Sequence, residues 1–331
     1  MVRGVVLAAL LSVVGSVGCV GAQEMPVRTP AAQVQSSSVF VSALALSADG
    51  SRLVLGGADG RVEVRSSSGQ ALSSWVHSSG VQGVSWSPDG ARVATSGRDG
   101  RVRVWNAADG RLLRVLTVGT YYVPSVAFSP DGSLVAVGTG DNTQLSGRGN
   151  SVRVWDVRSG RVLGVLLGHT DVVTSVSWSP DGRFVASGSR DRTVRVWDVA
   201  ARREVRWLRG FGDWVSAVAF SPDGSRLGVA SLDGRVRLWN ASSGVVDEVG
   251  APLVLAGHVG PVLSLAFSRD SAVLASGGED RTVRVWDARS GAALASWEAH
   301  ASGVTAVTFG VDGRVVSTGG RDRSVRWWVW R

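Results

Sequence analysis

Lysine and isoleucine are missing from this chain of 331 residues, and all 35 of its basic residues are arginine. Without lysine there is no P-loop lysine to hold a nucleotide phosphate and no amine to form a Schiff base. The chain has only one cysteine, Cys19, which lies outside the repeats described below. An intrachain disulfide is therefore excluded, and we expect neither a catalytic thiol nor a zinc site built from cysteine and histidine in the repeats.

The arginines give the chain a formal net charge of +8. A strongly basic chain invites comparison with nucleic-acid-binding proteins. Many of the arginines, however, alternate with apolar residues in stretches such as RVRVW, which places them on the solvated side of a strand. An arginine-only composition is also what a GC-rich genome produces. We interpret the charge as a solvated outer surface and expect no nucleic-acid partner.

A turn phrase recurs seven times along the chain. SPDG occurs at 87–90, 129–132, 179–182 and 221–224, and related phrases occur at 47–50, 268–271 and 310–313. A second aspartate follows each phrase, at Asp59, Asp99, Asp141, Asp191, Asp233, Asp280 and Asp322. These second aspartates are 40, 42, 50, 42, 47 and 42 residues apart. Seven repeats therefore fill almost the whole chain after residue 27.

Each repeat combines alternating apolar and polar residues with Asp-Gly turns, a pattern that predicts short antiparallel strands joined by hairpins. Four strands in about 42 residues make one propeller blade. We therefore predict an all-β, seven-bladed β-propeller of four-stranded antiparallel blades. It should be a single domain over 28–331, with blades near 37–75, 76–116, 117–166, 167–208, 209–255, 256–297, and 298–331 completed by 28–36.

The third strands carry the residues by which the sequence resembles a known family. RVRVWN (101–106), SVRVWD (151–156), TVRVWD (193–198), RVRLWN (235–240) and TVRVWD (282–287) resemble the tryptophan-aspartate ending of WD repeats. The resemblance implies structural hydrogen-bond sets of His, Ser or Thr, Asp and Trp. The sets carried over are His77, Thr95, Asp99 and Trp105; His169, Ser187, Asp191 and Trp197; His258, Ser276, Asp280 and Trp286; and His300, Thr318, Asp322 and Trp328.

The blades without a histidine change at two positions together. Where the histidine position holds Ser37, Gly119 or Phe211, the hydroxyl position holds Leu55, Val137 or Val229. A buried hydroxyl that loses its partner is costly, whereas replacing both partners by apolar groups is nearly neutral. All four histidines are thus explained as structural residues, with a metal ligand or general base as the alternative. No histidine remains for a catalytic triad, so we expect no enzyme activity, cofactor or metal.

The N-terminus has the layout of a bacterial secretory signal peptide over 1–22, followed by a short linker over 23–27. SVGC at 16–19 resembles a lipobox in which Cys19 is acylated, although Ser16 stands where leucine is usual. VGA at 20–22 offers an ordinary cleavage site, and an uncleaved anchor is a further alternative. We expect an exported protein of the cell envelope, in the periplasm or at the outer membrane as a lipoprotein, or alternatively secreted.

WD repeats are binding platforms as a family, so the resemblance implies a protein or peptide partner. The candidate contacts on the face with the loops between second and third strands are Phe40, Arg98, Tyr122, Arg190, Arg192, Trp214, Arg281, Arg321 and Arg323, beside Glu279. Arginine and aromatic residues are typical of binding hot spots. We predict a monomeric, non-catalytic scaffold for an acidic peptide or protein. The aromatic residues have a second interpretation, as fillers of the space that the missing histidines leave.

An alternative function is a propeller hydrolase, or a carbohydrate or small-molecule binder, that uses acidic residues at the central channel. The insertion NTQLSGRGN (142–150) lengthens a loop on the candidate face and is a further candidate contact for a partner. The insertion VVDEVGAP (245–252) should lie on the opposite face.

The last repeat, which ends in SVRWWVW, has three strands and no fourth. An uncovered apolar edge strand invites aggregation. By the family's register, residues 29–34 (TPAAQV) should supply the missing strand, with Ala31 and Val34 pointing inward. This strand would begin at the face opposite the arginine-rich one, so a lipid on Cys19 would leave the arginine-rich face free.

Overall fold

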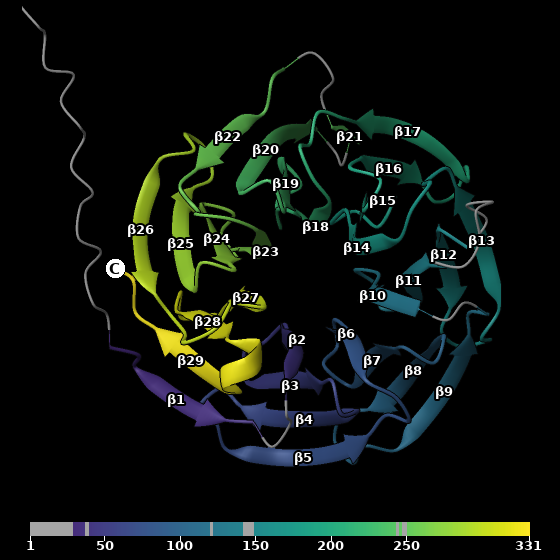
Figure 1. The fold of residues 1–331 in the computed structure, drawn as a ribbon. Coiled ribbons are helices and arrows are strands. Elements are labelled where there is room, and N and C mark those ends of the chain that lie inside the picture. Colours follow the sequence, from purple (N-terminus) through teal and green to yellow (C-terminus); the bar gives the residue numbers. More distant parts are fainter. Residues whose placement is uncertain (1–28, 37–39, 120–121, 142–148, 243–244, 247–249) are drawn as a thin grey trace, which may run out of the picture.

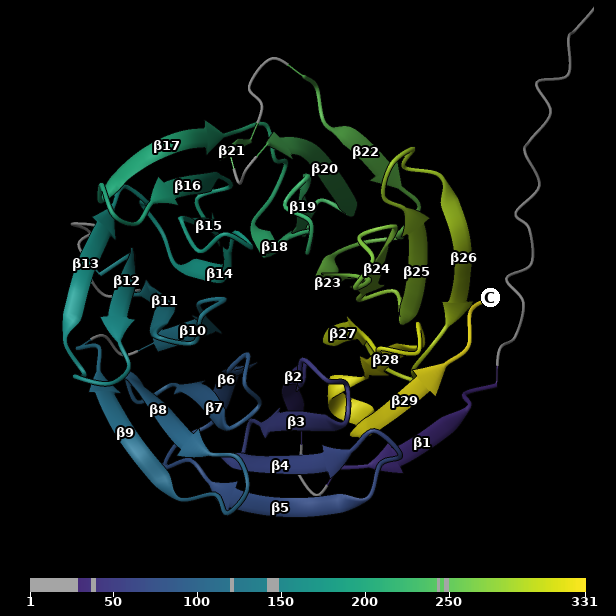
Figure 2. The ribbon, with the colours of Figure 1, turned by 180° about the vertical axis from the view of Figure 1, so that it is seen from behind.

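The computed structural model describes residues 29–36, 40–119, 122–141, 149–242, 245–246 and 250–331. Seven small antiparallel sheets stand around a central axis, with the first strand of each sheet innermost and the fourth on the circumference (Figures 1 and 2). The chain is an all-β propeller of seven four-stranded blades, as predicted. The signal peptide, the linker, Cys19, Ser37 and most of the insertion at 142–150 lie outside the described residues.

The first three blades follow one another along the chain. Blade 1 contains β2 (Val41–Leu46), β3 (Arg52–Gly57), β4 (Arg61–Ser66) and β5 (Ala71–Val76). Blade 2 contains β6 (Val81–Trp86), β7 (Arg92–Gly97), β8 (Arg101–Asn106) and β9 (Leu112–Thr117). Blade 3 contains β10 (Tyr122–Phe128), β11 (Leu134–Gly140), β12 (Ser151–Asp156) and β13 (Val162–Leu167).

The next three blades repeat this order. Blade 4 contains β14 (Val173–Trp178), β15 (Phe184–Ser189), β16 (Val194–Asp198) and β17 (Arg203–Leu208). Blade 5 contains β18 (Val215–Phe220), β19 (Arg226–Ser231), β20 (Arg235–Ser242) and β22 (Leu253–Ala256), and the short β21 (Val245–Val246) pairs with the end of β20. Blade 6 contains β23 (Val262–Phe267), β24 (Val273–Gly278), β25 (Thr282–Asp287) and β26 (Ala293–Glu298).

Blade 7 combines both ends of the described chain. It contains β27 (Ala306–Phe309), β28 (Val315–Thr318), a 3-10 turn η1 (Gly320–Asp322) and β29 (Ser324–Trp328), and its outer strand is β1 (Ala32–Gln35). β1 pairs antiparallel with β29, with Ala32 opposite Trp327 and Val34 opposite Val325. The N-terminal strand therefore closes the ring (Figure 1).

The inward-facing residues of the closing strand differ from the prediction by one position. Ala32 and Val34 are half-buried and pack against the core between blades 7 and 1, whereas Ala31 is exposed. Side chains alternate across a strand with a period of two, so Val34 and Ala31, three residues apart, cannot share a face. The predicted pair Ala31 and Val34 is thus corrected to Ala32 and Val34.

The tight turns between first and second strands follow directly from their sequence. In the turn of blade 2, Ser87 Oγ donates to Asp89, and Asp89 Oδ1 accepts from the backbone N–H of Ala91 at 2.9 Å. Gly90 has a φ of 64°, a conformation that glycine adopts without steric cost. The Ser-x-Asp-Gly phrase thereby satisfies its own polar groups at the surface.

The apolar cores lie between neighbouring sheets. One core combines Val54 and Val62 of blade 1 with Val81 and Val93 of blade 2. A hydrogen bond crosses the same interface, because Trp86 Nε1 donates to the carbonyl of Ala45 at 3.1 Å. Each blade is therefore stabilised by both of its neighbours. Among the described residues no helix is long and apolar enough to span a membrane.

Candidate functional site

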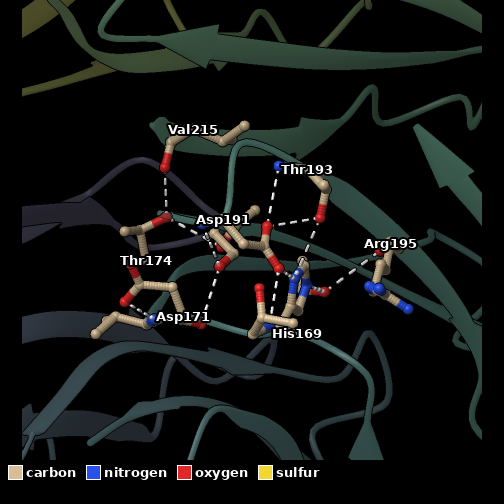
Figure 3. A network of polar contacts seen from close by, with 12 residues as sticks. His169, Asp171, Thr174, Asp191, Thr193, Arg195 and Val215 are labelled. Carbon is tan, nitrogen blue, oxygen red and sulfur yellow. Dashed lines mark hydrogen bonds and ion pairs between the residues drawn. The ribbon is translucent and has the colours of Figure 1, made fainter. Parts of the chain in front are cut away.

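We call the face that carries the turns between second and third strands the upper face, and the opposite face the lower face. The blade 4 turn at Asp191 shows how an upper-face turn is held (Figure 3). His169 Nδ1 lies 2.8 Å from Asp191 Oδ2, and His169 Nε2 lies 2.8 Å from Ser187 Oγ. Trp197 Nε1 donates to the same Ser187 Oγ at 2.8 Å.

This geometry fixes the role of each group. The Asp191 carboxylate accepts the Nδ1 proton, so Nε2 of His169 accepts from Ser187, whose oxygen in turn accepts from the indole. Burial acts to raise the pKa of Asp191, but hydrogen bonds from His169 and Thr193 outweigh it and lower the pKa to about 2. Every polar group of the set is satisfied, which makes His169 a structural residue.

Blade 6 repeats the arrangement. His258 Nδ1 lies 3.0 Å from Asp280, Nε2 lies 2.8 Å from Ser276 Oγ, and Trp286 Nε1 donates to Ser276 at 2.9 Å. Burial acts to raise the pKa of Asp280, and the hydrogen bond from His258 more than reverses this effect, so the pKa is well below its usual value.

Blade 7 uses a different hydroxyl from the predicted one. His300 Nε2 lies 2.8 Å from Ser317 Oγ, and Trp328 Nε1 donates to Ser317 at 2.8 Å, so Thr318 is not the partner. In blade 4 the hydroxyl residue Ser187 lies four residues before Asp191, and the prediction applied the same spacing to Asp322. In blade 7 the turn is one residue longer, so the equivalent hydroxyl belongs to Ser317. His300 Nδ1 still lies 3.0 Å from Asp322.

Blade 2 departs further from the predicted set. Arg103 Nη1 lies 2.8 Å from His77 Nε2, and Arg103 Nη2 lies 2.8 Å from Asp99, so the guanidinium stands between the two predicted partners. Thr95 still accepts from Trp105 Nε1 at 2.8 Å. Burial and the nearby Arg103 charge lower the pKa of His77 to about 4. Arginine occupies the position of Arg103 in blades 4 and 6 as well, as Arg195 and Arg284, so it does not distinguish blade 2. The signal that was missed is the residue two positions after the aspartate, which is Thr193 or Thr282, each donating to its aspartate, in blades 4 and 6 and Arg101 in blade 2.

In blade 5 an aromatic group takes the place of the histidine. Phe211 is buried, its ring centroid lies 5.6 Å from that of Trp239, and Val229 is buried in the same core. Arg237 completes this site, because its guanidinium lies 5.1 Å from the Phe211 ring and forms a 2.8 Å ion pair with Asp233. In the two other blades without a histidine, the residues at the hydroxyl position are also buried: Leu55 in blade 1 and Val137 in blade 3. Gly119, at the histidine position of blade 3, has a φ of 79°, and a Cβ added there would meet no atom within 4 Å.

Three neighbouring blades bring an arginine and two aromatic rings together on the upper face. The guanidinium carbon of Arg190 lies 4.5 Å from the ring centroid of Trp214 and 5.9 Å from that of Tyr122. Trp214 is 41% exposed, and Phe211 already fills the histidine position of its blade. Trp214 is therefore not a filler. Among the described residues, Arg190 Nε is buried without a hydrogen-bond partner.

The remaining aromatic candidate lies elsewhere on the upper face. Phe40 is half-buried against blade 7, where a Cβ added to Gly320 would come within 2.9 Å of its ring. It lines a hollow of about 550 Å³ together with Glu279, Arg281 and Arg321. This hollow presents both signs of charge. A larger hollow of about 610 Å³ lies on the lower face around Trp330, away from all the candidate residues.

The other candidate arginines are exposed on the upper face: Arg98, Arg192, Arg281, Arg321 and Arg323. Arg281 forms a 3.2 Å ion pair with Glu298. Arg192, Arg281 and Arg323 have φ values of 62°, 69° and 57°, a left-handed conformation that costs a non-glycine residue about 1–2 kcal/mol. Blades 1, 2 and 5 have glycine at this turn position, namely Gly60, Gly100 and Gly234. The structure does not bring the nine candidates into one cluster.

Within the described parts of the chain, no group of three or more His, Cys, Asp or Glu side chains is placed to hold a metal ion.

The ring of seven blades with histidine-centred turn sets defines a class of repeat propellers. The family described as WD domain, G-beta repeat matches six segments of the chain: 69–106, 110–156, 160–198, 202–240, 252–287 and 291–329. The chain therefore belongs to the WD-repeat family. Propellers of this family typically act as protein-interaction scaffolds and are generally not catalytic. No curated protein sequence matches the chain.

The matched segments are offset from the blades. The segment 69–106, for example, contains the outer strand β5 of blade 1 and the three inner strands β6, β7 and β8 of blade 2. Residues 29–66 lie outside the six matches, yet β1, β2, β3 and β4 have the same arrangement of one outer strand followed by three inner strands. The seventh repeat is thus recognised by its structure.

Proposed function

We propose that this protein is an exported, non-catalytic scaffold whose upper face binds an acidic segment of a protein partner. The observation that carries the proposal is the position of Arg190 between the rings of Trp214 and Tyr122. Stacking holds the guanidinium in place before a partner arrives, so less side-chain entropy is lost on binding. Arginine and tryptophan are also the residues that most often dominate binding energy.

The chemistry of the partner follows from the charge of this site. The Arg190 side chain is only partly buried, and a guanidinium forms charge-assisted hydrogen bonds with a carboxylate. The exposed Trp214 supplies an apolar surface beside it. A segment with one or two carboxylates next to an apolar side chain fits both features. Export rests on the signal-like segment 1–22, and we propose the periplasm or the outer membrane as the location.

A defined acidic probe tests the charge preference. Binding of a fluorescein-labelled oligoglutamate peptide to the full chain is measured by fluorescence anisotropy at low and high salt. We expect Arg190→Ala to weaken binding about tenfold, in line with the loss of one charge-assisted contact. Arg269→Ala, which removes an exposed arginine from the lower face, is the matched control and should have no effect.

A pull-down from envelope extract tests the proposal with natural partners. The triple variant Arg98→Ala, Arg190→Ala and Arg321→Ala should lose the specific partners that the unchanged protein retains. If the triple variant keeps every partner, or if Arg269→Ala weakens the peptide as much as Arg190→Ala does, the upper face is not the binding surface.

A further inference from the structure

The outer strands of blades 2 and 3 carry more exposed aliphatic side chains than those of the other blades. On β9, Leu112, Leu113 and Val115 are each at least 40% exposed. On β13, Val162, Leu163, Val165 and Leu167 are each at least 40% exposed. Of the other outer strands, β5 has two such side chains, β22 and β26 have one each, and the exposed large apolar residue of β17 is Trp207. The two strands are neighbours on the circumference (Figures 1 and 2). We call β9 and β13 together the aliphatic rim.

Contacts between the blades make the aliphatic rim continuous. Arg114, in the middle of β9, extends to blade 3, where its Nη2 donates to the carbonyl of Arg158 at 2.6 Å. A Cβ added to Gly160 would lie 3.4 Å from Cδ of Arg114, so the stem of this arginine covers the junction. On the other side, Leu163 lines a hollow of about 330 Å³ with Val199 and Arg202 of blade 4.

The charges around the aliphatic rim are mostly positive. Arg111, Arg114, Arg158 and Arg161 lie in the two strands or the turns that lead into them, and all four are exposed. The same segments contain two aspartates, Asp109 and Asp156, each of which accepts a backbone hydrogen bond from its own turn. An exposed aliphatic surface of this extent on a soluble domain indicates an interaction surface.

The chemistry of the rim favours a bilayer over a protein. Leucine and valine are under-represented among protein hot spots, and the aromatic residues that dominate such sites are absent from both strands. A second copy of the chain would bring two surfaces together that are each flanked by four exposed arginines. At the surface of an anionic membrane, aliphatic side chains insert at the boundary between headgroups and acyl chains, and arginines are attracted to the anionic headgroups.

The position of the rim on the ring agrees with this choice. Leu112 and Val162 begin their strands at the lower face, since β8 and β12 run from the upper to the lower face. β1 also begins at the lower face, because its first residue Ala32 pairs with Trp327 near the end of β29. We infer that the aliphatic rim inserts its leucine and valine side chains into the surface of an anionic membrane, with this side of the circumference and the adjoining edge of the lower face toward the bilayer.

An environment-sensitive label tests the inference at the rim itself. In the full chain carrying Cys19→Ser, a single cysteine is placed at Leu113→Cys or Leu163→Cys and labelled with nitrobenzoxadiazole. The control is Leu294→Cys on β26, which is similarly exposed on the opposite side of the ring (Figure 1). With phosphatidylglycerol vesicles we expect a blue shift at both rim positions, quenching by brominated acyl chains, and neither effect at Leu294→Cys.

Three results would overturn the inference. The first is no spectral change at either rim position with these vesicles, whether or not the protein floats with them. The second is an equal change at Leu294→Cys. The third is a rim change that appears without vesicles as the protein concentration rises, which would assign the rim to a second copy. Leu112→Ser with Leu113→Ser should lower vesicle binding several-fold at an unchanged melting temperature, and phosphatidylcholine vesicles should bind less than phosphatidylglycerol vesicles.

Discussion

Two adjacent hydroxyls in blade 7 have opposite roles. Ser317 Oγ contacts His300 Nε2 and Trp328 Nε1, whereas Thr318 Oγ1 has no hydrogen-bond partner among the described residues, although both side chains are fully buried. Removing the hydroxyl of Ser317 should therefore lower the free energy of unfolding, whereas removing the hydroxyl of Thr318 should not.

We predict that Ser317→Ala lowers the free energy of unfolding by about 1–3 kcal/mol, because it leaves two buried donors or acceptors without a partner. Thr318→Val, which keeps the shape and removes only the unpaired hydroxyl, should be neutral or slightly stabilising. Urea unfolding of the two variants measures the difference. Equal destabilisation by both variants would restore Thr318 to the set and contradict the assignment of Ser317.

His77 gives the protein a dependence of stability on pH. Its pKa in the folded state is about 4, below the ordinary histidine value of 6.5, because burial and the Arg103 charge disfavour the protonated ring. Between pH 6.5 and 4 the unfolded state binds a proton that the folded state does not, so stability falls as the pH falls. Below pH 4 both states are protonated and this contribution stops changing.

We predict that His77→Gln reduces the loss of stability between pH 6.5 and 4. A pKa difference of this size corresponds to a free energy on the order of 3 kcal/mol. Part of the dependence should remain, because burial also lowers the pKa of His300. Urea midpoints at pH 7 and pH 4.5 give the comparison. An identical drop in the unchanged protein and in His77→Gln would show that His77 does not cause it.

At the residue scale the sequence predicts hydrogen-bond partners where the repeat keeps its length and a threonine follows two residues after the turn aspartate. His169 and His258 meet both conditions. Ser317 was missed because a turn gained one residue and the count from Asp322 shifted. Arg103 was missed because Arg101 stands in blade 2 where Thr193 and Thr282 donate to the aspartates of blades 4 and 6. Without that hydroxyl, the Arg103 guanidinium contacts both Asp99 and His77.

At the scale of elements, β1 links the last blade to the first. Val34 packs with Trp327 and Leu53, and a Cβ added to Gly69 of blade 1 would come within 2.5 Å of Val34 Cγ1. Arg65 of blade 1 donates to the carbonyl of Gln35 at 3.0 Å. The sequence predicted this strand from the missing fourth strand of the last repeat.

We predict that deletion of residues 29–36 lowers the melting temperature and causes association that increases with protein concentration. The deletion exposes the Trp327 edge of β29, whose backbone groups then lack their partners. Calorimetry and light scattering check both effects. Ala31→Ser is the control, since this side chain is exposed. A deletion variant that stays monomeric with an unchanged melting temperature would contradict a role for β1 in closure.

At the scale of the whole molecule, the number of blades and their order follow from the repeat alone, because each turn phrase marks one first hairpin. The repeat alone does not predict that Arg190 lies near the rings of Tyr122 and Trp214 on the upper face. Arg190, Tyr122 and Trp214 are far apart in the sequence, and their approach depends on the rotation between blades 3, 4 and 5. The aliphatic rim was likewise not predicted, because alternation alone does not show that an outer strand lacks a covering layer.

The two proposed surfaces occupy different parts of the ring. The acidic partner would bind the upper face around Arg190, and the membrane would contact the circumference at Leu113 and Leu163 toward the lower face. Since the two surfaces do not overlap, both contacts can exist at once. The scaffold would then hold its partner at the membrane surface and direct it away from the lipid.

Closure by β1 also sets the order in which the protein can mature. Gln33 on β1 contacts Arg326 on β29 across a sequence separation of 293 residues. At a synthesis rate of about 5–20 residues per second, β1 emerges roughly 15–60 seconds before its partner. During that interval blades can form one after another, but the first strand has no site to occupy. A chain that stops before β29 would therefore remain an open ring, however many blades it had already completed.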